Sequence, residues 1–437
     1  MELRETFRNA GIIGAGGAGF PSYAKLSEGA DTLLINGAEC EPLLYTDYVI
    51  LKRELDTVLL GIEKILEETP IRTAFLCIKA HTAKRLSFKD GESLAANIKI
   101  KVLPDVYPMG DEISLIYEAT GRLVNPGNLP ITVGVIVYNV ETVYNLGRAA
   151  LGFGGVYMKW LTVGGDVEKP TVIKVPVGTS VSEIFTRLGI NIKEGYTVID
   201  GGPSMGRAIN PERSFVTKTT KGLLLLPDSI EAVRTKNINQ KAAVARAETA
   251  CCQCTRCTDM CPRALLGYPL EPHKMVRTAM GAASVMPQMV ISATLCCGCG
   301  ICESLACSQG ISPKAVINNY KAVLAEHKMR YFTKQSVDPT PEREYRMIPS
   351  DKWAATLGVL RFDRVCEFGG EFSDVQRVEI PLSKHIGAPS LACVSSGDTV
   401  TRGQVIAVAD EGLSVPQHAS IDGRVTVLSR KIIIDRI

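Results

Sequence analysis

The most informative stretch of this chain is Cys251-Cys252-Gln253-Cys254-Thr255-Arg256-Cys257-Thr258-Asp259-Met260-Cys261-Pro262. A second run of closely spaced cysteines extends from Cys296 to Cys307. The two runs together hold ten of the 14 cysteines. A disulfide scaffold spreads its cysteines along a short secreted chain, whereas this crowding within a long chain indicates bound metal.

The spacing within each run is typical of iron–sulfur ligation. Three thiolates separated by two residues can surround one corner of a cubane cluster, and the fourth thiolate must come from elsewhere. In two-cluster ferredoxins the last cysteine of each run binds the other cluster. This rule assigns one 4Fe-4S cluster to Cys251, Cys254, Cys257 and Cys307, and the second to Cys296, Cys299, Cys302 and Cys261.

Two alternatives remain open for the cysteines. Two zinc sites with four thiolates each also use cysteine pairs separated by two residues. Cys252 and Cys297 are in excess and could replace Cys251 and Cys296, or remain buried thiols beside the metal.

Length and composition limit the class of protein. The 437 residues suggest about three domains at roughly 150 residues each. The 49 basic and 46 acidic residues nearly balance, so no basic surface for nucleic acid is implied. No apolar run reaches the roughly 18 residues of a membrane span, and the N-terminus has no apolar signal region. We therefore expect a soluble, cytoplasmic protein.

Changes in sequence texture suggest four parts. Strand-like runs such as Thr32–Asn36 and Thr73–Lys79 alternate with helical patterns in residues 1–155, which predicts a Rossmann-like α/β domain with a parallel sheet. Residues 156–228 read as a small α+β module with one helix ending at Leu188. The dicluster ferredoxin domain takes residues 229–335, and a β module takes residues 350–437, after a charged, proline-containing linker over 331–350.

A glycine-rich loop lies near the N-terminus at Gly14-Ala15-Gly16-Gly17-Ala18-Gly19-Phe20-Pro21. The literal G-x-G-x-x-G spacing is weak support for a dinucleotide site, because no strand is expected before it. Glycines nevertheless let backbone amides approach a phosphate, and Lys25 could add a positive charge. A plain turn without a ligand is the alternative reading.

Three further segments follow expected strand ends, where α/β sheets place ligand loops. They are Asn36-Gly37-Ala38-Glu39-Cys40-Glu41-Pro42, Tyr107-Pro108-Met109-Gly110-Asp111-Glu112 and Asn139-Val140-Glu141-Thr142. Their amides and carboxylates could bind ribose hydroxyls and flavin ring edges. Each is individually compatible with a solvated turn or a helix cap.

Taken together, these four loops resemble the flavin- and NADH-binding subunit of respiratory complex I. With two ferredoxin clusters downstream, the order of motifs is similar to the C subunits of Rnf complexes, and most similar to the cobalamin reductases of propanediol-utilisation microcompartments. The resemblance covers nearly the whole chain. Residues 158–226 resemble a soluble-ligand-binding (SLBB) β-grasp module. The C-terminal part resembles a lipoyl-like barrel-sandwich, without the lysine that a swinging arm needs at the hairpin tip.

The resemblance implies specific cofactor contacts. FMN phosphate and its ribityl chain would be held by Gly16, Gly17, Gly19 and Lys25, and the flavin ring by Asn36, Glu39, Gly110 and Asn139. The NADH pocket would be lined by Phe20, Glu41 and Glu112. Gly14, Asp111 and Thr142 lie in the same loops and complete the predicted cofactor site. Ala15 and Ala38 stand where the complex I loops carry an arginine and an acidic residue, so FMN could be held weakly.

The function implied by the resemblance is electron transfer from NADH through FMN and two 4Fe-4S clusters to an acceptor. The acceptor would be cobalamin on a partner enzyme, similar to an adenosyltransferase, among microcompartment proteins inside a bacterial microcompartment. One alternative is an Rnf-type subunit that docks on a membrane complex or passes electrons to another partner reductase. The other is a metal-stabilised binding module without catalysis. The terminal acceptor, the choice of NADH over NADPH and the oligomeric state stay open.

Overall fold

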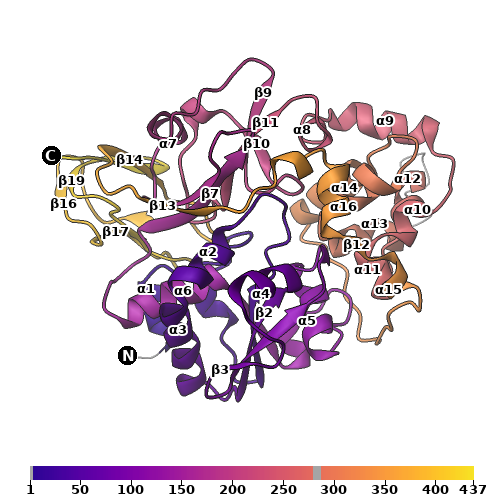
Figure 1. Ribbon diagram of the computed structural model, residues 1–437, viewed down its shortest axis with the longest axis horizontal. Coiled ribbons are helices and arrows are strands. Elements are labelled where there is room, and N and C mark those ends of the chain that lie inside the picture. Colours follow the sequence, from indigo (N-terminus) through magenta and orange to yellow (C-terminus); the bar gives the residue numbers. More distant parts are fainter. Residues whose placement is uncertain (1–2, 279–286) are drawn as a thin grey trace.

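The computed structural model describes residues 3–278 and 287–437 (Figure 1). Its first sheet has the strand order β3-β4-β2-β1-β6. The pairs β4–β2, β2–β1 and β1–β6 are parallel, and only β3 runs antiparallel to its neighbour. The strands are β1 (Thr32–Gly37), β2 (Thr73–Lys79), β3 (Ser93–Ala95), β4 (Ile98–Leu103) and β6 (Val135–Asn139). The predicted parallel α/β sheet is therefore confirmed.

Alternating side chains of this sheet enter two separate hydrophobic cores. Leu33 and Ile35 of β1 face one core, and Leu34 between them faces the other. The first core is covered by α1, α2, α3 and α6, and the second by α5 together with cysteine-rich helices further along the chain. These helices are α1 (Leu3–Asn9), α2 (Thr46–Arg53), α3 (Leu55–Glu68), α4 (Ala80–Leu86), α5 (Glu112–Thr120) and α6 (Val140–Ala150).

The helical pattern after Thr46 forms two helices, α2 and α3, which meet at Glu54. Helix α3 lies unusually close to α6. A Cβ on Gly61 would be 2.2 Å from the carbonyl oxygen of Val143, and one on Gly147 would be 2.0 Å from that of Thr57. Glycine at both positions is therefore what lets these two helix backbones touch.

The second sheet contains six strands in the order β10-β9-β11-β7-β8-β13. They are β7 (Met158–Gly165), β8 (Thr171–Pro176), β9 (Tyr196–Asp200), β10 (Arg207–Ile209), β11 (Gly222–Pro227) and β13 (Glu367–Glu371). The helix α7 (Val181–Arg187) lies where the sequence predicts one. Strand β13 comes from far along the chain and pairs in parallel with β8.

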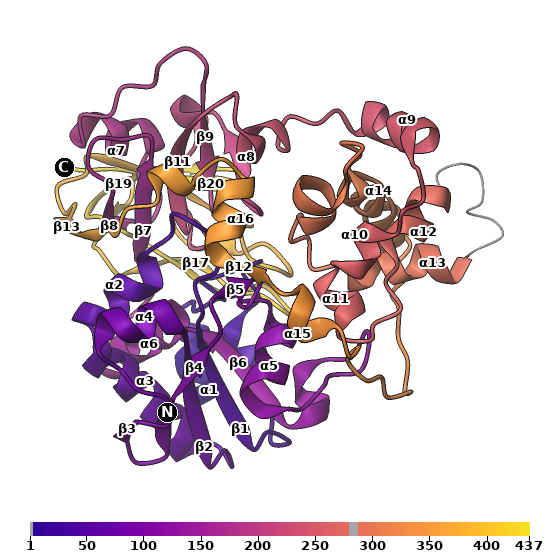
Figure 2. The same cartoon turned by 45° about the vertical axis from the view of Figure 1, so that its right-hand side comes forward.

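The cysteine-rich part is a group of short helices, which Figure 2 shows beside the two larger sheets rather than between them. Its elements are α8 (Glu231–Arg234), α9 (Gln240–Ala250), α10 (Arg256–Asp259), α11 (Pro262–Leu265), α12 (Pro272–Arg277), α13 (Pro287–Ser292) and α14 (Pro313–Glu326). Within the described residues, no helix has the length and apolar character needed to cross a membrane.

After the cysteine-rich part the chain returns to the first sheet domain through α15 (Arg343–Arg346), β12 (Ile348–Pro349) and α16 (Ser350–Thr356). Strand β12 pairs with β5 (Val106–Tyr107). The buried Trp353 stacks on Tyr107 with ring centroids 4.7 Å apart, and its indole N–H donates to Ser204 Oγ at 2.8 Å. The end of the expected linker is therefore paired with β5 rather than free. Charge and proline content did not reveal this, because they carry no information about strand pairing.

The last module has two small sheets, β14-β20-β19-β16 and β15-β17-β18, around one hydrophobic core. Its strands are β14 (Arg377–Pro381), β15 (Leu391–Ala392), β16 (Thr399–Val400), β17 (Val405–Val408), β18 (Gln417–His418), β19 (Gly423–Leu428) and β20 (Lys431–Asp435). Residues 350–371, just before it, pack instead with the first two sheets.

Candidate functional site

The glycine loop of residues 14–19 is closed at its base by backbone contacts. The amide of Gly14 donates to the carbonyl of Phe20 at 2.9 Å, and Ile13 forms an antiparallel bridge with Pro21. Helix α1 precedes the loop and a single 3₁₀ turn, Ser22–Lys25, follows it. The strand and helix of a dinucleotide-binding fingerprint are absent here, as the sequence led us to expect.

The glycines of this loop face different surroundings. A Cβ on Gly16 would lie 3.0 Å from Asn139 Nδ2, whereas one on Gly17 would meet no heavy atom within 4 Å. Because no protein atom crowds Gly17, the loop leaves room there for a ligand. Gly19 has φ +74° and lies against Thr219 and Lys384, so packing between modules already explains this glycine. Its role in FMN binding stays a prediction.

The four predicted loops meet at the carboxyl edge of the first sheet. Asn36 Nδ2 donates to the carbonyl of Gly110 at 3.0 Å, and Asn139 Nδ2 donates to the carbonyl of Asn36 at 3.2 Å. The amide of Ala15 donates to Thr142 Oγ1 at 3.1 Å. Residues far apart in the chain therefore form one connected group.

Lys25 and Glu112 form an ion pair of 2.8 Å at the open side of this group. Lys25 Nζ also donates to the carbonyl of Val137 at 3.0 Å. About a third of each side chain is exposed. Both groups remain accessible to a charged ligand, which could exchange with the ion-pair partner.

The two predicted acidic residues of the second loop are both half-buried and hydrogen-bonded. Glu39 accepts from the amides of Thr46 and Asp47 at 2.9 and 3.1 Å, at the start of α2. Burial, reinforced by the charge of Asp47, raises the pKa of Glu39 to about 8. Glu41 instead accepts from the amides of Ser204 and Met205 at 2.8 and 3.0 Å, and burial raises its pKa.

The contacts of Glu41 tie the second loop to the second sheet domain. Its predicted place in an NADH pocket stays a prediction, and so does that of Phe20, whose carbonyl closes the glycine loop. Asp111 caps α5 by accepting from Ser114 N at 3.2 Å, and it also forms an ion pair of 2.7 Å with Arg263. Asp111 thus joins the loops at the carboxyl edge of the first sheet to the cysteine-rich helices.

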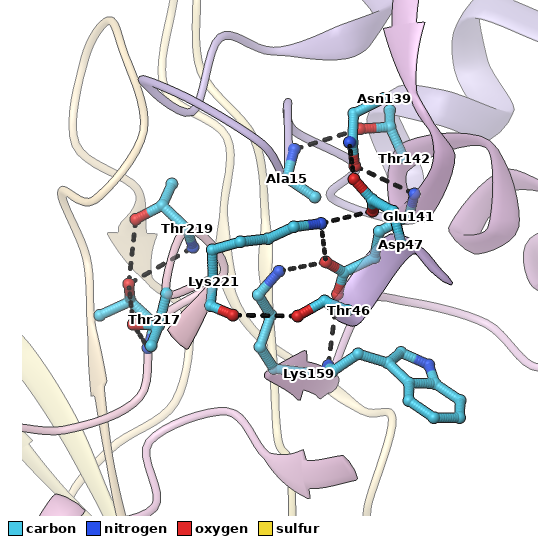
Figure 3. Close-up of polar contacts among 12 residues, drawn as sticks. Ala15, Thr46, Asp47, Asn139, Glu141, Thr142, Lys159, Thr217, Thr219 and Lys221 are labelled. Atoms are coloured by element: carbon cyan, nitrogen blue, oxygen red, sulfur yellow. Dashed lines mark hydrogen bonds and ion pairs between the residues drawn. The ribbon is translucent and has the colours of Figure 1, made fainter. Parts of the chain in front are cut away.

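A buried network of four charged residues beneath these loops was missed by sequence reasoning (Figure 3). Lys159 pairs with Glu141, and Lys221 pairs with Asp47 at 2.5 Å and lies 3.8 Å from Glu141. Asp47 Oδ2 also accepts from Asn139 Nδ2 at 2.9 Å. The network therefore fixes the side chain of Asn139 through Asp47. It also joins β7, α2 and α6 to the loop before β11.

The charges of the network depend on one another. Burial lowers the pKa of Lys159, and the neighbouring Glu141 opposes this shift. Burial also opposes protonation of Lys221, but the carboxylates of Asp47 and Glu141 raise its pKa overall. One signal in the sequence could have pointed to this network: a lysine, Lys159, stands inside the otherwise apolar strand of residues 158–163.

The ten clustered cysteines surround two hollows. One is lined by Cys251, Cys254, Cys257 and Cys307, and the other by Cys261, Cys296, Cys299 and Cys302. Cys252 borders the first hollow and Cys297 the second. Each group of five includes the four that the crossing rule for two clusters combines, and the choice of ligands among the five stays a prediction. Across residues 3–278 and 287–437, no three Cys, His, Asp or Glu side chains converge closely enough to hold one metal ion.

The second hollow lies near the strand-end loops. The hydroxyl of Tyr107 donates to the carbonyl of Cys299 at 2.8 Å, and Asp111 of the same loop reaches Arg263. Burial raises the pKa of Cys261 to about 12, an effect that the backbone amides of Ala264 and Arg263 oppose. A bound metal would reverse this preference, because it binds the thiolate.

Family comparisons agree with this arrangement along the chain. Residues 7–148 match the Nuo51 FMN-binding domain, residues 250–312 a 4Fe-4S dicluster domain, and residues 371–435 the RnfC barrel sandwich hybrid domain. The protein is thus an oxidoreductase with an FMN-binding domain and a 4Fe-4S dicluster domain.

Full-length relatives define the family more closely. Cobalamin reductase PduS of Salmonella typhimurium is 38% identical over 99% of this chain and 96% of its own length. The PduS of Citrobacter freundii is 37% identical over 99% of this chain and 95% of its own. The chain belongs to the PduS cobalamin reductase family.

More distant similarities cover less of the chain. The RnfC-type component of the ion-translocating oxidoreductase complex of Rhodobacter capsulatus is 31% identical over 65% of this chain and 54% of its own length. An NAD+-reducing [NiFe]-hydrogenase in the H2-reduced state superimposes with a TM-score of 0.45 at 17% identity, over 75% of this chain and 61% of that chain.

Proposed function

We propose that this protein is an NADH-dependent reductase that holds FMN and two 4Fe-4S clusters and delivers electrons to cobalamin on a partner enzyme. The observation that carries the proposal is the pair of hollows, each lined by the four cysteines that the crossing rule combines. The residues fit both kinds of cofactor: four thiols surround each hollow, and the glycine loop has free space at Gly17.

The cofactors would supply the redox chemistry. FMN accepts the two electrons of a hydride and can release them singly, and cubane clusters accept single electrons. The chain would hold these groups close together. Tyr107 and Asp111 extend from the strand-end loops to the residues beside the second hollow.

Charged and polar groups of the α/β domain would bind and orient the flavin and NADH. Lys25, at the partly exposed ion pair with Glu112, would supply positive charge for phosphate. The amides of the glycine loop would approach the same phosphate closely. Asn36 and Asn139, held by each other's loops and by Asp47, would present fixed polar groups to the flavin ring.

The acceptor rests on family membership. Its relatives of similar length carry the name cobalamin reductase, so we propose cobalamin as the terminal acceptor. A cobalamin-handling enzyme would be the partner, and, by the resemblance to microcompartment reductases, the setting would be a bacterial microcompartment.

Anaerobic purification followed by analysis of iron, sulfide, zinc and flavin tests the proposal. We expect about eight irons, the content of two cubanes, together with FMN. The broad visible absorbance should bleach on addition of NADH, with NADPH run in parallel. Zinc in place of iron, or clusters that NADH cannot reduce even with FMN supplied, would contradict the proposal.

Electron delivery is tested with cobalamin directly. Addition of NADH and then hydroxocobalamin to the flavin-loaded protein should reduce cob(III)alamin, followed by its visible spectrum. The same assay with ferricyanide as an artificial acceptor shows whether a failure lies in the acceptor or in the earlier electron path.

A further inference from the structure

Arg263 lies between the second hollow and the strand-end loops. It follows Cys261 and Pro262 in α11 and lines the hollow together with the four cysteines assigned to the second cluster. Its Nη2 donates to Asp111 Oδ1 at 2.7 Å. The two side chains are only 12% and 10% exposed, so this contact is shielded from solvent.

The guanidinium has a buried donor that lacks an acceptor. Arg263 Nε is buried and makes no hydrogen bond in the described residues. Buried polar groups in folded proteins nearly always have a partner, because an unmade bond costs the full desolvation of the group. A charged donor beside a hollow lined by cysteines therefore indicates that its acceptor is what the hollow holds.

We propose that Arg263 Nε donates a hydrogen bond to a sulfur of the cluster held by Cys261, Cys296, Cys299 and Cys302. This inference rests on the proposed function, because it requires that cluster. Arg263 is then a positioning and tuning residue: Asp111 holds Nη2 of its guanidinium, and Nε meets the sulfur.

The sign of its effect on the cluster follows from charge. Reduction adds negative charge to the cluster, so a positive guanidinium and a hydrogen bond to sulfur favour the reduced state and raise the reduction potential. The carboxylate of Asp111 partly offsets the positive charge. Asp111 lies beside Gly110 and Glu112, so events at the predicted cofactor loops would be transmitted electrostatically to the second cluster.

Redox titration of the anaerobically purified full chain, followed by EPR of each cluster, tests this. Arg263→Gln should shift the reduction equilibrium of one cluster about tenfold toward the oxidised form, which is about 59 mV for a one-electron couple. The other cluster should keep its potential. Arg256→Gln is the matched control, because Arg256 adjoins Cys257 but is exposed, and it should move neither potential.

A second variant should shift the reduction potential of the same cluster in the opposite direction. Asp111→Asn retains a helix-capping side chain but removes the offsetting charge, so the same cluster should rise in potential. If the Arg263→Gln protein does not hold its second cluster, the redox titration of Asp111→Asn decides whether the inference stands. A reduction potential of the second cluster that is unchanged or lower in Asp111→Asn overturns it.

Failure of this inference is distinguishable from failure of the proposed function. Arg263→Gln with about eight irons, as two cubanes require, and unmoved potentials overturns the role of Arg263 and leaves the reductase intact. Equal shifts in Arg263→Gln and Arg256→Gln overturn it as well. Unaltered protein that binds one cluster or none contradicts the proposed function itself.

Discussion

The strand-end loops of the first sheet and the cysteine-rich helices differ in how many of their predicted functional side chains are already bonded to other protein groups. In the loops, nearly every predicted side chain already has a protein partner: Asn36 bonds Gly110, Glu41 bonds Ser204, and Lys25 pairs with Glu112. Five cysteines line each hollow, Cys254 and Cys257 among them at the first. Burial raises the pKa of Cys257 to about 12, and the neighbouring cysteines add to the shift.

This difference shows two ways of building a cofactor site. The loops are fixed in advance by hydrogen bonds within the protein, so a weakly bound cofactor could leave without collapse of the site. The candidate ligands at the hollows are thiols, which make weak hydrogen bonds, so metal binding and local folding should be coupled there. Breaking one residue in each region tests this contrast.

The largest expected effect is loss of a cluster. Cys302→Ser removes a thiolate from the second hollow, so iron should fall from about eight to about four per chain, as loss of one cubane requires, and delivery of electrons to cobalamin should largely stop. Iron and sulfide analysis with EPR measures this. Cys252→Ser is the control and should retain both clusters; iron loss there would instead show that Cys252 replaces Cys251.

The buried network should give the largest effect on stability. Lys159→Met leaves Glu141 buried with only the more distant Lys221, which should cost about 3–5 kcal/mol. Thermal unfolding followed by circular dichroism measures the loss. Lys64→Met breaks the exposed pair with Glu67 and should leave the unfolding temperature nearly unchanged. Similar losses in the two variants would show that burial of the network is unimportant.

The pH dependence of stability reports on Glu39. Its pKa is about 8 in the folded protein and about 4.3 in an unfolded chain. Between these values the folded state holds a proton that the unfolded state releases, so stability falls as the pH rises through this window.

The variant Glu39→Gln should remove this part of the pH dependence. The slope contributed by one group is at most about 1.4 kcal/mol per pH unit. Thermal unfolding between about pH 5.5 and 8, inside the window that the two pKa values define, compares the variant with unaltered protein. Glu212→Gln, which lies at an exposed position, is the control. A slope that Glu39→Gln leaves unchanged would mean that Glu39 is ionised in the fold.

The smallest expected effect concerns flavin affinity. Lys25→Met removes a positive charge from the open side of the loops and should weaken FMN binding by about 1 kcal/mol, or roughly fivefold in Kd. Flavin fluorescence titration of protein stripped of FMN measures this. Lys52→Met, which breaks an exposed pair with Glu367, should leave the affinity unchanged, and a matching loss there would remove Lys25 from the site.

Local patterns predicted much of this molecule. The strand Thr73–Lys79 has the predicted ends, because a strand's apolar run and its boundaries are read from neighbouring positions. Five cysteines line each hollow, and which four of them would bind a cluster stays a prediction. That the two hollows hold 4Fe-4S clusters, and which residues bind FMN and NADH, stay predictions.

Contacts between segments far apart in the sequence could not be predicted from local patterns. Glu41 reaches the second sheet domain at Ser204, and nothing near Glu41 in the sequence specifies that partner. Strand β13 joins β8 although the whole cysteine-rich part of the chain separates them. The pairing of Lys159 with Glu141 needed the fold, because a lone lysine in an apolar strand does not say which carboxylate it meets.

The return of the chain through β12 has a mechanical consequence. The cysteine-rich part is held at its entrance by α8, whose Ala232 and Val233 pack in the same core as Trp353, and at its exit by β12 and the Trp353–Tyr107 stack. A module anchored at both ends cannot swing on a single tether as a mobile carrier does. An electron leaving this protein would therefore wait for its acceptor to arrive, and the rate of turnover would follow how often the two proteins meet.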